Sequence, residues 1–119
     1  MSRILYAEDN DDLRKAVARA LSRLGHEVIA LNNAARAWEL LQEGERFDLI
    51  ISDFEMPEMD GVTFLTKVRR NPDIATTPFA VLSGCGDETV ARRVTEMGAR
   101  YFSKRTVSVK DMVSEMLSL

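Results

Sequence analysis

The strongest constraint on the fold is an alternation, repeated five times, between short apolar runs and longer segments whose apolar residues recur at helical spacing. Continuous apolar runs are typical of strands that are covered on both faces, as in parallel sheets. Because a helical segment separates each run from the next, right-handed crossovers can place helices on both faces of one sheet. The sequence therefore predicts an open α/β sandwich with five parallel strands and five helices.

Cap and turn residues mark where the periodicity changes. Asn10, Asp11 and Asp12 are possible caps for the N-terminus of the first helix, and Asp87 can cap the fourth. Gly25 and Gly98 can end these helices. The predicted strands are 4–7, 28–31, 47–52, 79–82 and 101–102, and the predicted helices are 13–24, 34–41, 62–68, 90–97 and 109–117. No linker or low-complexity stretch interrupts this pattern, so we expect residues 1–119 to form one domain.

The length and composition agree with a single domain that needs no covalent or metal staple. A chain of 119 residues, of which 45% are hydrophobic, can bury its own core and is too short for a second folded unit. Cys85 is the only cysteine and His26 the only histidine, so neither an internal disulfide nor a Cys/His metal cluster can form. We expect an inert Cys85 and a reducing, cytoplasmic location.

Charge and hydropathy argue against two classes of partner. Sixteen Lys and Arg against nineteen Asp and Glu give a net charge of -3, so no overall basic field attracts nucleic acid. No apolar run approaches the roughly 20 residues that span a bilayer, and no signal-peptide core follows the first residues. We therefore expect neither nucleic acid nor membrane as a partner. The basic residues of the first predicted helix indicate a solvated face: Arg14, Lys15, Arg19 and Arg23.

Charged and hydroxyl side chains follow four of the five predicted strands. These residues are Glu8, Asp9, Asp53, Ser83 and Lys104. In an open parallel sheet the carboxyl ends of the strands meet at the edge where ligands bind. Two carboxylates about 5 Å apart repel by roughly 3 kcal/mol at an effective dielectric of about 20, so clustered acids either raise a pKa or hold a cation. Hard oxygen ligands favour Mg²⁺.

The same residues can support phosphoryl transfer to a carboxylate. Asp53 is the candidate nucleophile, while Lys104, the Ser83 hydroxyl and Mg²⁺ compensate charge on the phosphoryl oxygens. A nucleotide cofactor has no anchor, since neither a P-loop nor a G-x-G-x-x-G turn follows the first strand. A calcium loop starting at Asp9 is excluded as well, because Arg14 stands where that loop needs Gly.

Four stretches of the chain together resemble the receiver domains of bacterial two-component response regulators. They are Ile4 to Asp9, Asp48 to Gly61, Val81 to Gly84 and Tyr101 to Lys104. The most specific is Asp53 to Gly61, which ends in Met-Pro-x-Met-Asp-Gly. The resemblance spans essentially the whole chain. It implies a flavodoxin-like, doubly wound sheet of order 2-1-3-4-5, the order also known from a chemotaxis receiver.

The resemblance also implies a role for each candidate residue in phosphorylation and switching. Asp53 corresponds to the residue that is phosphorylated, and Lys104 to the lysine paired with it. Ser83 corresponds to the hydroxyl that moves to the phosphoryl group, and Tyr101 to the ring that turns inward as the hydroxyl moves. The switch is then a local change of charge acting on a face with two stable arrangements.

A second implication of the resemblance concerns the metal. Glu8, Asp9 and Asp53 correspond to the acids that hold Mg²⁺, and Glu55 corresponds to the residue that adds its backbone carbonyl. The implied donor is a sensor histidine kinase or a histidine phosphotransfer protein, and the implied output is a downstream protein effector. Such a chain phosphorylates and dephosphorylates itself at Asp53 but turns over no external substrate. We expect either a stand-alone receiver or one excised from a hybrid kinase.

Two positions depart from the family pattern. The family usually has a cis proline after the active-site lysine, where this sequence has Arg105. A cis Lys-Arg bond costs about 3 to 4 kcal/mol, so we expect a trans peptide and a differently shaped loop after Lys104. Gly84 stands where a small Ala is common, which loosens the loop after the fourth strand without preventing phosphorylation.

Two other functions are compatible with parts of the sequence. A haloacid-dehalogenase-like phosphatase places its nucleophile in a D-x-D after the first strand, and Asp9-Asn10-Asp11 has that spacing. Against it, Leu13 stands where Thr or Val is needed, and there is no cap domain. The other alternative is a degenerate receiver that acts only as a binding module, which is favoured if Arg105 displaces Lys104.

Overall fold

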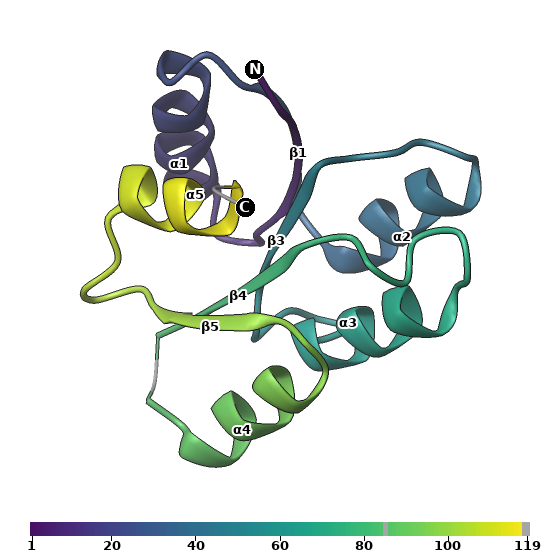
Figure 1. Cartoon of the computed structure of the whole chain (residues 1–119). Coiled ribbons are helices and arrows are strands. Elements are labelled where there is room, and N and C mark those ends of the chain that lie inside the picture. Colours follow the sequence, from purple (N-terminus) through teal and green to yellow (C-terminus); the bar gives the residue numbers. More distant parts are fainter. Residues whose placement is uncertain (85, 118–119) are drawn as a thin grey trace.

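The five predicted strands form one parallel sheet. The protein's structure, a computed structural model, describes residues 1–84 and 86–117. The strands are β1 (Arg3–Ala7), β2 (Glu27–Leu31), β3 (Leu49–Asp53), β4 (Phe79–Ser83) and β5 (Arg100–Ser103). They pair in the order β2-β1-β3-β4-β5, with all four ladders parallel (Figure 1). This confirms the predicted α/β class and the strand order that the resemblance implied.

Helices cover both faces of the sheet. They are α1 (Asp11–Arg23), α2 (Ala34–Gln42), α3 (Gly61–Arg70), α4 (Glu88–Glu96) and α5 (Val109–Leu117). Helices α1 and α5 lie together on one face, and α2, α3 and α4 lie on the other (Figure 1). The side chain of Asp87 accepts hydrogen bonds from the first turn of α4, as predicted, and of the three candidates at α1 it is Asn10 that caps the helix. The N-termini of α1 and α4 are therefore both capped by side chains.

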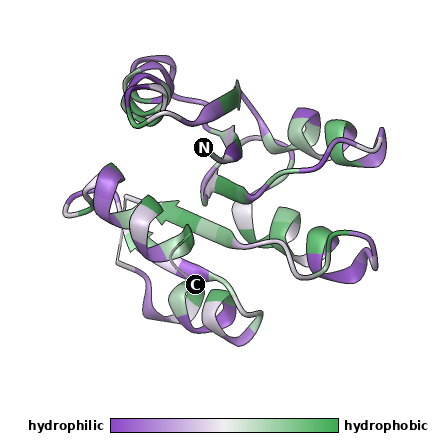
Figure 2. Ribbon diagram, turned by 45° about the horizontal axis from the view of Figure 1, so that its top comes forward, coloured by the Kyte–Doolittle hydropathy of each residue, from purple (hydrophilic) through white to green (hydrophobic). Residues whose placement is uncertain are grey.

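Alternation along the strands divides the core into two layers. On β1, Leu5 and Ala7 face the layer under α2, α3 and α4, whereas Ile4 and Tyr6 face the layer under α1 and α5. Figure 2 shows hydrophobic residues along the central strands and polar residues mixed into the surrounding helices. Because both faces are covered, the chemically active side chains are confined to the strand ends and the loops that follow.

The structure corrects the start of the third strand and confirms the predicted trans peptide bond after Lys104. The third strand starts at Leu49 rather than Phe47, because Phe47 and Asp48 precede the ladder with β1. No cis peptide bond occurs in the part of the chain that the structure describes, so the Lys104-Arg105 bond is trans, as expected. Cys85 lies outside the described residues. None of the described helices is long and apolar enough to cross a membrane.

Gly61 fixes the loop that follows β3. Its amide donates to the carbonyl of Phe54 at 2.8 Å, so the first turn of α3 lies directly on the end of β3. A Cβ atom at Gly61 would lie 2.6 Å from the Asp53 carbonyl oxygen and 3.0 Å from the Phe54 Cα. Both obstacles are backbone atoms, so no side chain can turn away to make room. Because Gly61 has no Cβ, the start of α3 can pack directly against the backbone of Asp53 and Phe54.

We predict that Gly61→Ala lowers the free energy of unfolding by about 1 to 3 kcal/mol, since the added methyl forces the backbone apart. Urea denaturation followed by circular dichroism measures the change. Gly86→Ala is the matched control, because a Cβ at that position meets nothing within 4 Å. Equal stability of the Gly61→Ala and Gly86→Ala variants would contradict the close approach.

Candidate functional site

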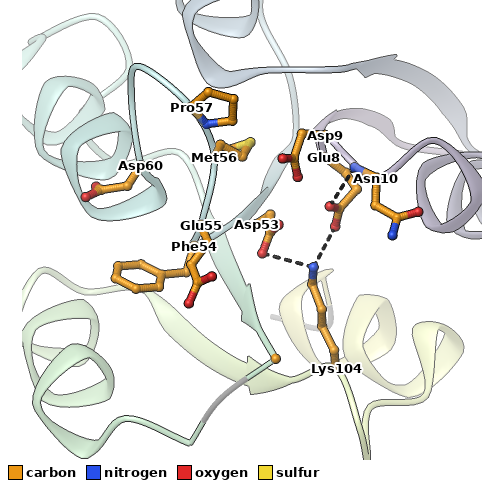
Figure 3. A pocket seen from close by; sticks show the side chains of 11 residues that line it. Glu8, Asp9, Asn10, Asp53, Phe54, Glu55, Met56, Pro57, Asp60 and Lys104 are labelled. Atoms are coloured by element: carbon orange, nitrogen blue, oxygen red, sulfur yellow. Dashed lines mark hydrogen bonds and ion pairs between the residues drawn. The ribbon is translucent and has the colours of Figure 1, made fainter.

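An open pocket lies at the carboxyl edge of the sheet, where the ends of β1, β3 and β5 meet. It is lined by Glu8, Asp9, Asn10, Asp53, Phe54, Glu55, Met56, Pro57, Asp60, Gly84 and Lys104. Figure 3 shows the acidic side chains of Glu8, Asp9 and Asp53 gathered together, with Lys104 reaching toward them from the segment after β5. Residues that are distant in sequence thus meet because parallel strands end on the same side.

Glu8 is held by contacts with three neighbouring elements. Its amide donates to the carbonyl of Leu31 at 3.0 Å, which extends the pairing of β1 with β2 by one residue. Its carbonyl accepts from Arg14 Nη1 at 3.0 Å, and its Oε2 accepts from the Asn10 amide at 3.2 Å. The residue is 0% exposed. Glu8 is therefore a buried carboxylate whose backbone and side chain are both held by hydrogen bonds.

Lys104 pairs with two carboxylates at once. Its ammonium nitrogen lies 3.0 Å from Glu8 Oε1 and 3.0 Å from Asp53 Oδ1 (Figure 3). Asp53 ends β3 and is 4% exposed. The backbone amide of Lys104 donates to the carbonyl of Ser83 at 2.9 Å, so β4 positions the lysine that follows β5. The presence of Arg105 does not displace Lys104 from Asp53.

The burial of this cluster changes its acid–base behaviour. Desolvation raises the pKa of Glu8 to about 7, and the nearby charge of Asp53 adds to the increase, while the Lys104 ammonium opposes it. Burial lowers the pKa of Lys104, but the hydrogen bonds and charges of Glu8 and Asp53 outweigh it, so the net change is upward. Lys104 is therefore firmly cationic.

The acidic residues could hold a divalent cation. Glu8, Asp9 and Asp53 each offer a carboxylate oxygen, and these atoms lie within 4.8 Å of one another. Hard oxygen donors and few protein ligands fit an ion that keeps part of its water shell, as Mg²⁺ does. Asp9 is exposed, so the site opens to solvent on one side. The donor set thus agrees with the cation expected from the sequence.

The remaining predicted residues lie around this cluster in different ways. Glu55 is exposed and lines the pocket. Ser83, at the end of β4, is 1% exposed, and half-buried Tyr101 on β5 packs against the core layer under α2, α3 and α4. Neither Ser83 nor Tyr101 lines the pocket. The switching roles of these two residues therefore stay predictions.

Two features of the site and its surroundings escaped the sequence analysis. Arg14 does not belong to a solvated helix face, because its guanidinium donates to the Glu8 carbonyl and pairs with Asp11 at 2.7 Å. Its position one turn after Asn10, on the side of α1 that faces β1, could have indicated this contact. Phe54 also lines the pocket, with its ring pointing away from Asp53 (Figure 3). The sequence shows only that Phe54 follows a strand.

Known proteins resemble this chain over almost its full length. The response regulator receiver domain family matches residues 4–116. The chain is 36% identical to the response regulator receiver protein CpdR of Brucella abortus (strain 2308), over 98% of this chain and 94% of that protein. The signal receiver domain of a signal transduction histidine kinase from Syntrophus aciditrophicus is 31% identical, with a TM-score of 0.86 over 99% of this chain and 91% of that chain.

A third relative is a metal-bound structure. The Mn²⁺-bound form of the response regulator Rcp1 is 25% identical, with a TM-score of 0.80 over 99% of this chain and 91% of that chain. Sequence match, fold and strand-end acids agree, and the chain belongs to the response regulator receiver domain family of two-component signalling. This confirms the family resemblance seen in the sequence.

We predict that the metal-free chain becomes less stable as the pH rises from about 4.5 to about 7. Folding raises the pKa of Glu8 from 4.5 to about 7, so within this interval the folded chain binds more protons than the unfolded chain. The free energy of unfolding therefore falls with rising pH, by about 3 kcal/mol at most from this residue.

Urea denaturation of the metal-free chain at about pH 5 and about pH 8 measures this effect. Glu8→Gln removes the titrating group and should weaken the pH dependence. Glu96→Gln, at an exposed position on α4, is the control that should retain it. An unchanged pH dependence in Glu8→Gln would assign the effect to another group.

Proposed function

We propose that the chain is a phosphoacceptor receiver that takes a phosphoryl group from phosphohistidine onto Asp53 in a Mg²⁺-dependent reaction. The observation that carries the proposal is the position of Asp53 at the centre of a cationic and acidic site. One of its oxygens pairs with Lys104 at 3.0 Å, and its carboxylate lies within 4.8 Å of those of Glu8 and Asp9. This is the set of groups that phosphoryl transfer to a carboxylate requires.

The transfer exchanges one bond to phosphorus for another. A carboxylate oxygen of Asp53 forms the new P–O bond, while the P–N bond of the donor phosphohistidine breaks and its electron pair returns to the imidazole. Lys104, already within 3.0 Å of Asp53, can follow the phosphoryl oxygens and compensate their charge. When bound by Glu8, Asp9, Asp53 and the carbonyl of Glu55, Mg²⁺ supplies further positive charge to these oxygens.

Support for a divalent cation comes from two sources. The donors on this chain are all oxygens, which suits Mg²⁺ or Mn²⁺ better than zinc. The response regulator Rcp1, which shares the fold, has a Mn²⁺-bound form. Glu8 and Asp53 are two buried carboxylates that share the single ammonium of Lys104. A divalent cation would therefore relieve the repulsion that remains between them.

The output of the proposed reaction is a change of conformation. Ser83 moves to the phosphoryl group, Tyr101 turns inward, and the face made by α4, β5 and α5 changes for a protein partner. The phosphoryl donor is a sensor histidine kinase or a histidine phosphotransfer protein, and the setting is the cytoplasm. Residues 1–119 act as one receiver domain. A receiver of this kind also loses the phosphoryl group by its own hydrolysis and has no external substrate.

The phosphatase alternative finds no support at the first strand. Its D-x-D would require Asp9 and Asp11 to act together, but Asp11 begins α1, pairs with Arg14 at 2.7 Å and does not line the pocket. The binding-module alternative depended on Arg105 displacing Lys104. Lys104 instead keeps both carboxylate contacts. Neither alternative is favoured.

We predict that acetyl phosphate with Mg²⁺ labels the wild-type chain once and leaves Asp53→Asn unlabelled, because the amide oxygen cannot accept phosphorus in the same way. Intact-mass spectrometry measures the label. Asp12→Asn, at an exposed position on α1, is the control and should be labelled like the wild type. Label retained by Asp53→Asn would assign the acceptor to another residue, and an unlabelled wild type would favour the binding module.

We predict opposite effects of Lys104→Met on cation binding and on phosphorylation. Without the ammonium, Glu8 and Asp53 lose their shared partner, so the metal-free chain is destabilised by about 3 kcal/mol and binds Mg²⁺ several-fold more tightly. Labelling by acetyl phosphate becomes slower, because a compensating charge is missing.

Calorimetric Mg²⁺ titration and the rate of mass labelling separate these two effects. Lys15→Met, which removes an exposed ammonium on α1, is the matched control and should change neither. Weaker Mg²⁺ binding by Lys104→Met would contradict the electrostatic argument.

A further inference from the structure

Tyr6 carries a polar group into the centre of the core. It lies near the carboxyl end of β1, between Ala30 of β2 and Ile51 of β3, and is 0% exposed. Its ring packs in the core layer under α1 and α5. A buried hydroxyl normally finds a hydrogen-bond partner, because burial without one costs free energy that an apolar side chain does not lose.

The Tyr6 hydroxyl is one of a pair of unpartnered atoms. Over residues 1–84 and 86–117, the buried side-chain polar atoms without a hydrogen bond are the Tyr6 hydroxyl and Glu8 Oε1. Because side chains alternate along a strand, Tyr6 and Glu8 project to the same face of the sheet. Glu8 Oε1 has the Lys104 ammonium at 3.0 Å as its charge partner. The Tyr6 hydroxyl and the Glu8 carboxylate thus lie on the same face of the sheet and close enough to interact, and one is a donor while the other is an acceptor.

The electrostatics of Tyr6 agree with this placement. Burial raises the pKa of the hydroxyl far above its usual range. The negative charges of Glu8 and Asp53 and a weak interaction of the hydroxyl with the Glu8 carboxylate raise the pKa further, while Arg14 opposes them. Tyr6 therefore keeps its proton throughout the physiological range, so the hydroxyl is available as a donor. Both carboxylates that influence it belong to the phosphoacceptor pocket.

We propose that Tyr6 is a positioning residue of the phosphoacceptor site: its hydroxyl donates to the buried Glu8 carboxylate when Lys104 turns to a phosphoryl group on Asp53. This inference rests on the proposed function. In the metal-free chain Lys104 divides its ammonium between Glu8 and Asp53. A phosphoryl group at Asp53 attracts that ammonium more strongly, so Glu8 Oε1 loses the ammonium, while Mg²⁺ would need only one oxygen of the Glu8 carboxylate.

The hydrogen bond from the Tyr6 hydroxyl has a specific consequence for the loaded form, in which Mg²⁺ and the phosphoryl group are bound. Glu8 is fully buried, so water cannot replace Lys104 at Oε1 without entering the core. With the Tyr6 hydroxyl in that place, the Glu8 carboxylate keeps its orientation while Lys104 acts on the phosphoryl oxygens. A phenylalanine at the same position fills the core equally well but offers no donor. Tyr6 thus favours the phosphorylated form over the free form.

Tyr6→Phe tests the inference, with beryllium fluoride and saturating Mg²⁺ as the probe for the phosphoryl group. We expect the dissociation constant of beryllium fluoride, measured by calorimetry, to rise about tenfold, as for loss of a hydrogen bond to a charged group. Without Mg²⁺ and beryllium fluoride we expect the Tm to change little, because the hydroxyl makes no full hydrogen bond in the structure. A residue that only packs the core would not produce this difference between the two forms.

Two further measurements sharpen the test. Ile51→Val is the matched control, since it removes one methylene from the residue opposite Tyr6 and touches no polar group. It should lower the Tm of both forms equally and leave the affinity for beryllium fluoride unchanged. In the chain labelled with 3-fluorotyrosine, the ¹⁹F signal that is missing from Tyr6→Phe identifies Tyr6. That signal should shift when beryllium fluoride and Mg²⁺ are added.

Each outcome bears on one of the two proposals. Equal affinity of wild type and Tyr6→Phe for beryllium fluoride, or an unmoved ¹⁹F signal in a wild type that binds it, overturns the role of Tyr6 alone. A wild type that neither binds beryllium fluoride nor accepts label from acetyl phosphate overturns the proposed function and this inference with it. A tenfold loss confined to the loaded form supports the positioning role.

Discussion

The ammonium of Lys104 lies between two buried carboxylates, and the organisation of the carboxyl edge of the sheet depends on this contact. Glu8 and Asp53 come from neighbouring parallel strands, so their side chains meet beyond the strand ends whether or not their charges favour it. Without a cation between them, two desolvated carboxylates repel strongly. Lys104, 3.0 Å from both, makes their coexistence possible in the metal-free chain. The site is therefore stable and at the same time ready to exchange one cationic partner for another.

That exchange gives a physical link between binding and signalling. A divalent ion or a phosphoryl group changes the charge that Lys104 meets, and Lys104 is tied through its backbone amide to Ser83. Movement of its side chain therefore takes place next to the end of β4, the strand that leads into α4. Within the proposed function, the hydroxyl of Ser83 and the proposed donor Tyr6 respond to the same event from two sides of the sheet. One acts on the phosphoryl group and the other on the carboxylate that Lys104 leaves.

The scaffold makes this exchange precise. Asp53 ends a strand in which every residue is buried. Gly61 lets α3 pack so closely against the carbonyl of Asp53 that no side chain would fit between them. Arg14 holds the backbone of Glu8 from α1. The acidic residues are therefore positioned by backbone that has little freedom to relax. Such rigidity maintains their mutual repulsion, which in turn drives cation binding.

The sequence by itself determined the class of fold, the order of its elements and the family, because apolar periodicity, cap residues and the Asp53 to Gly61 motif are local signals. It also identified the acids and the lysine of the site, since strand ends are visible in the pattern. Only the tertiary structure decided that Lys104 contacts Glu8 and Asp53 equally despite Arg105, that Arg14 supports Glu8, and that the Tyr6 hydroxyl is buried without a hydrogen bond. These facts depend on distances between side chains of different strands and helices, and on burial. No local pattern encodes them, because the packing of the whole chain sets them.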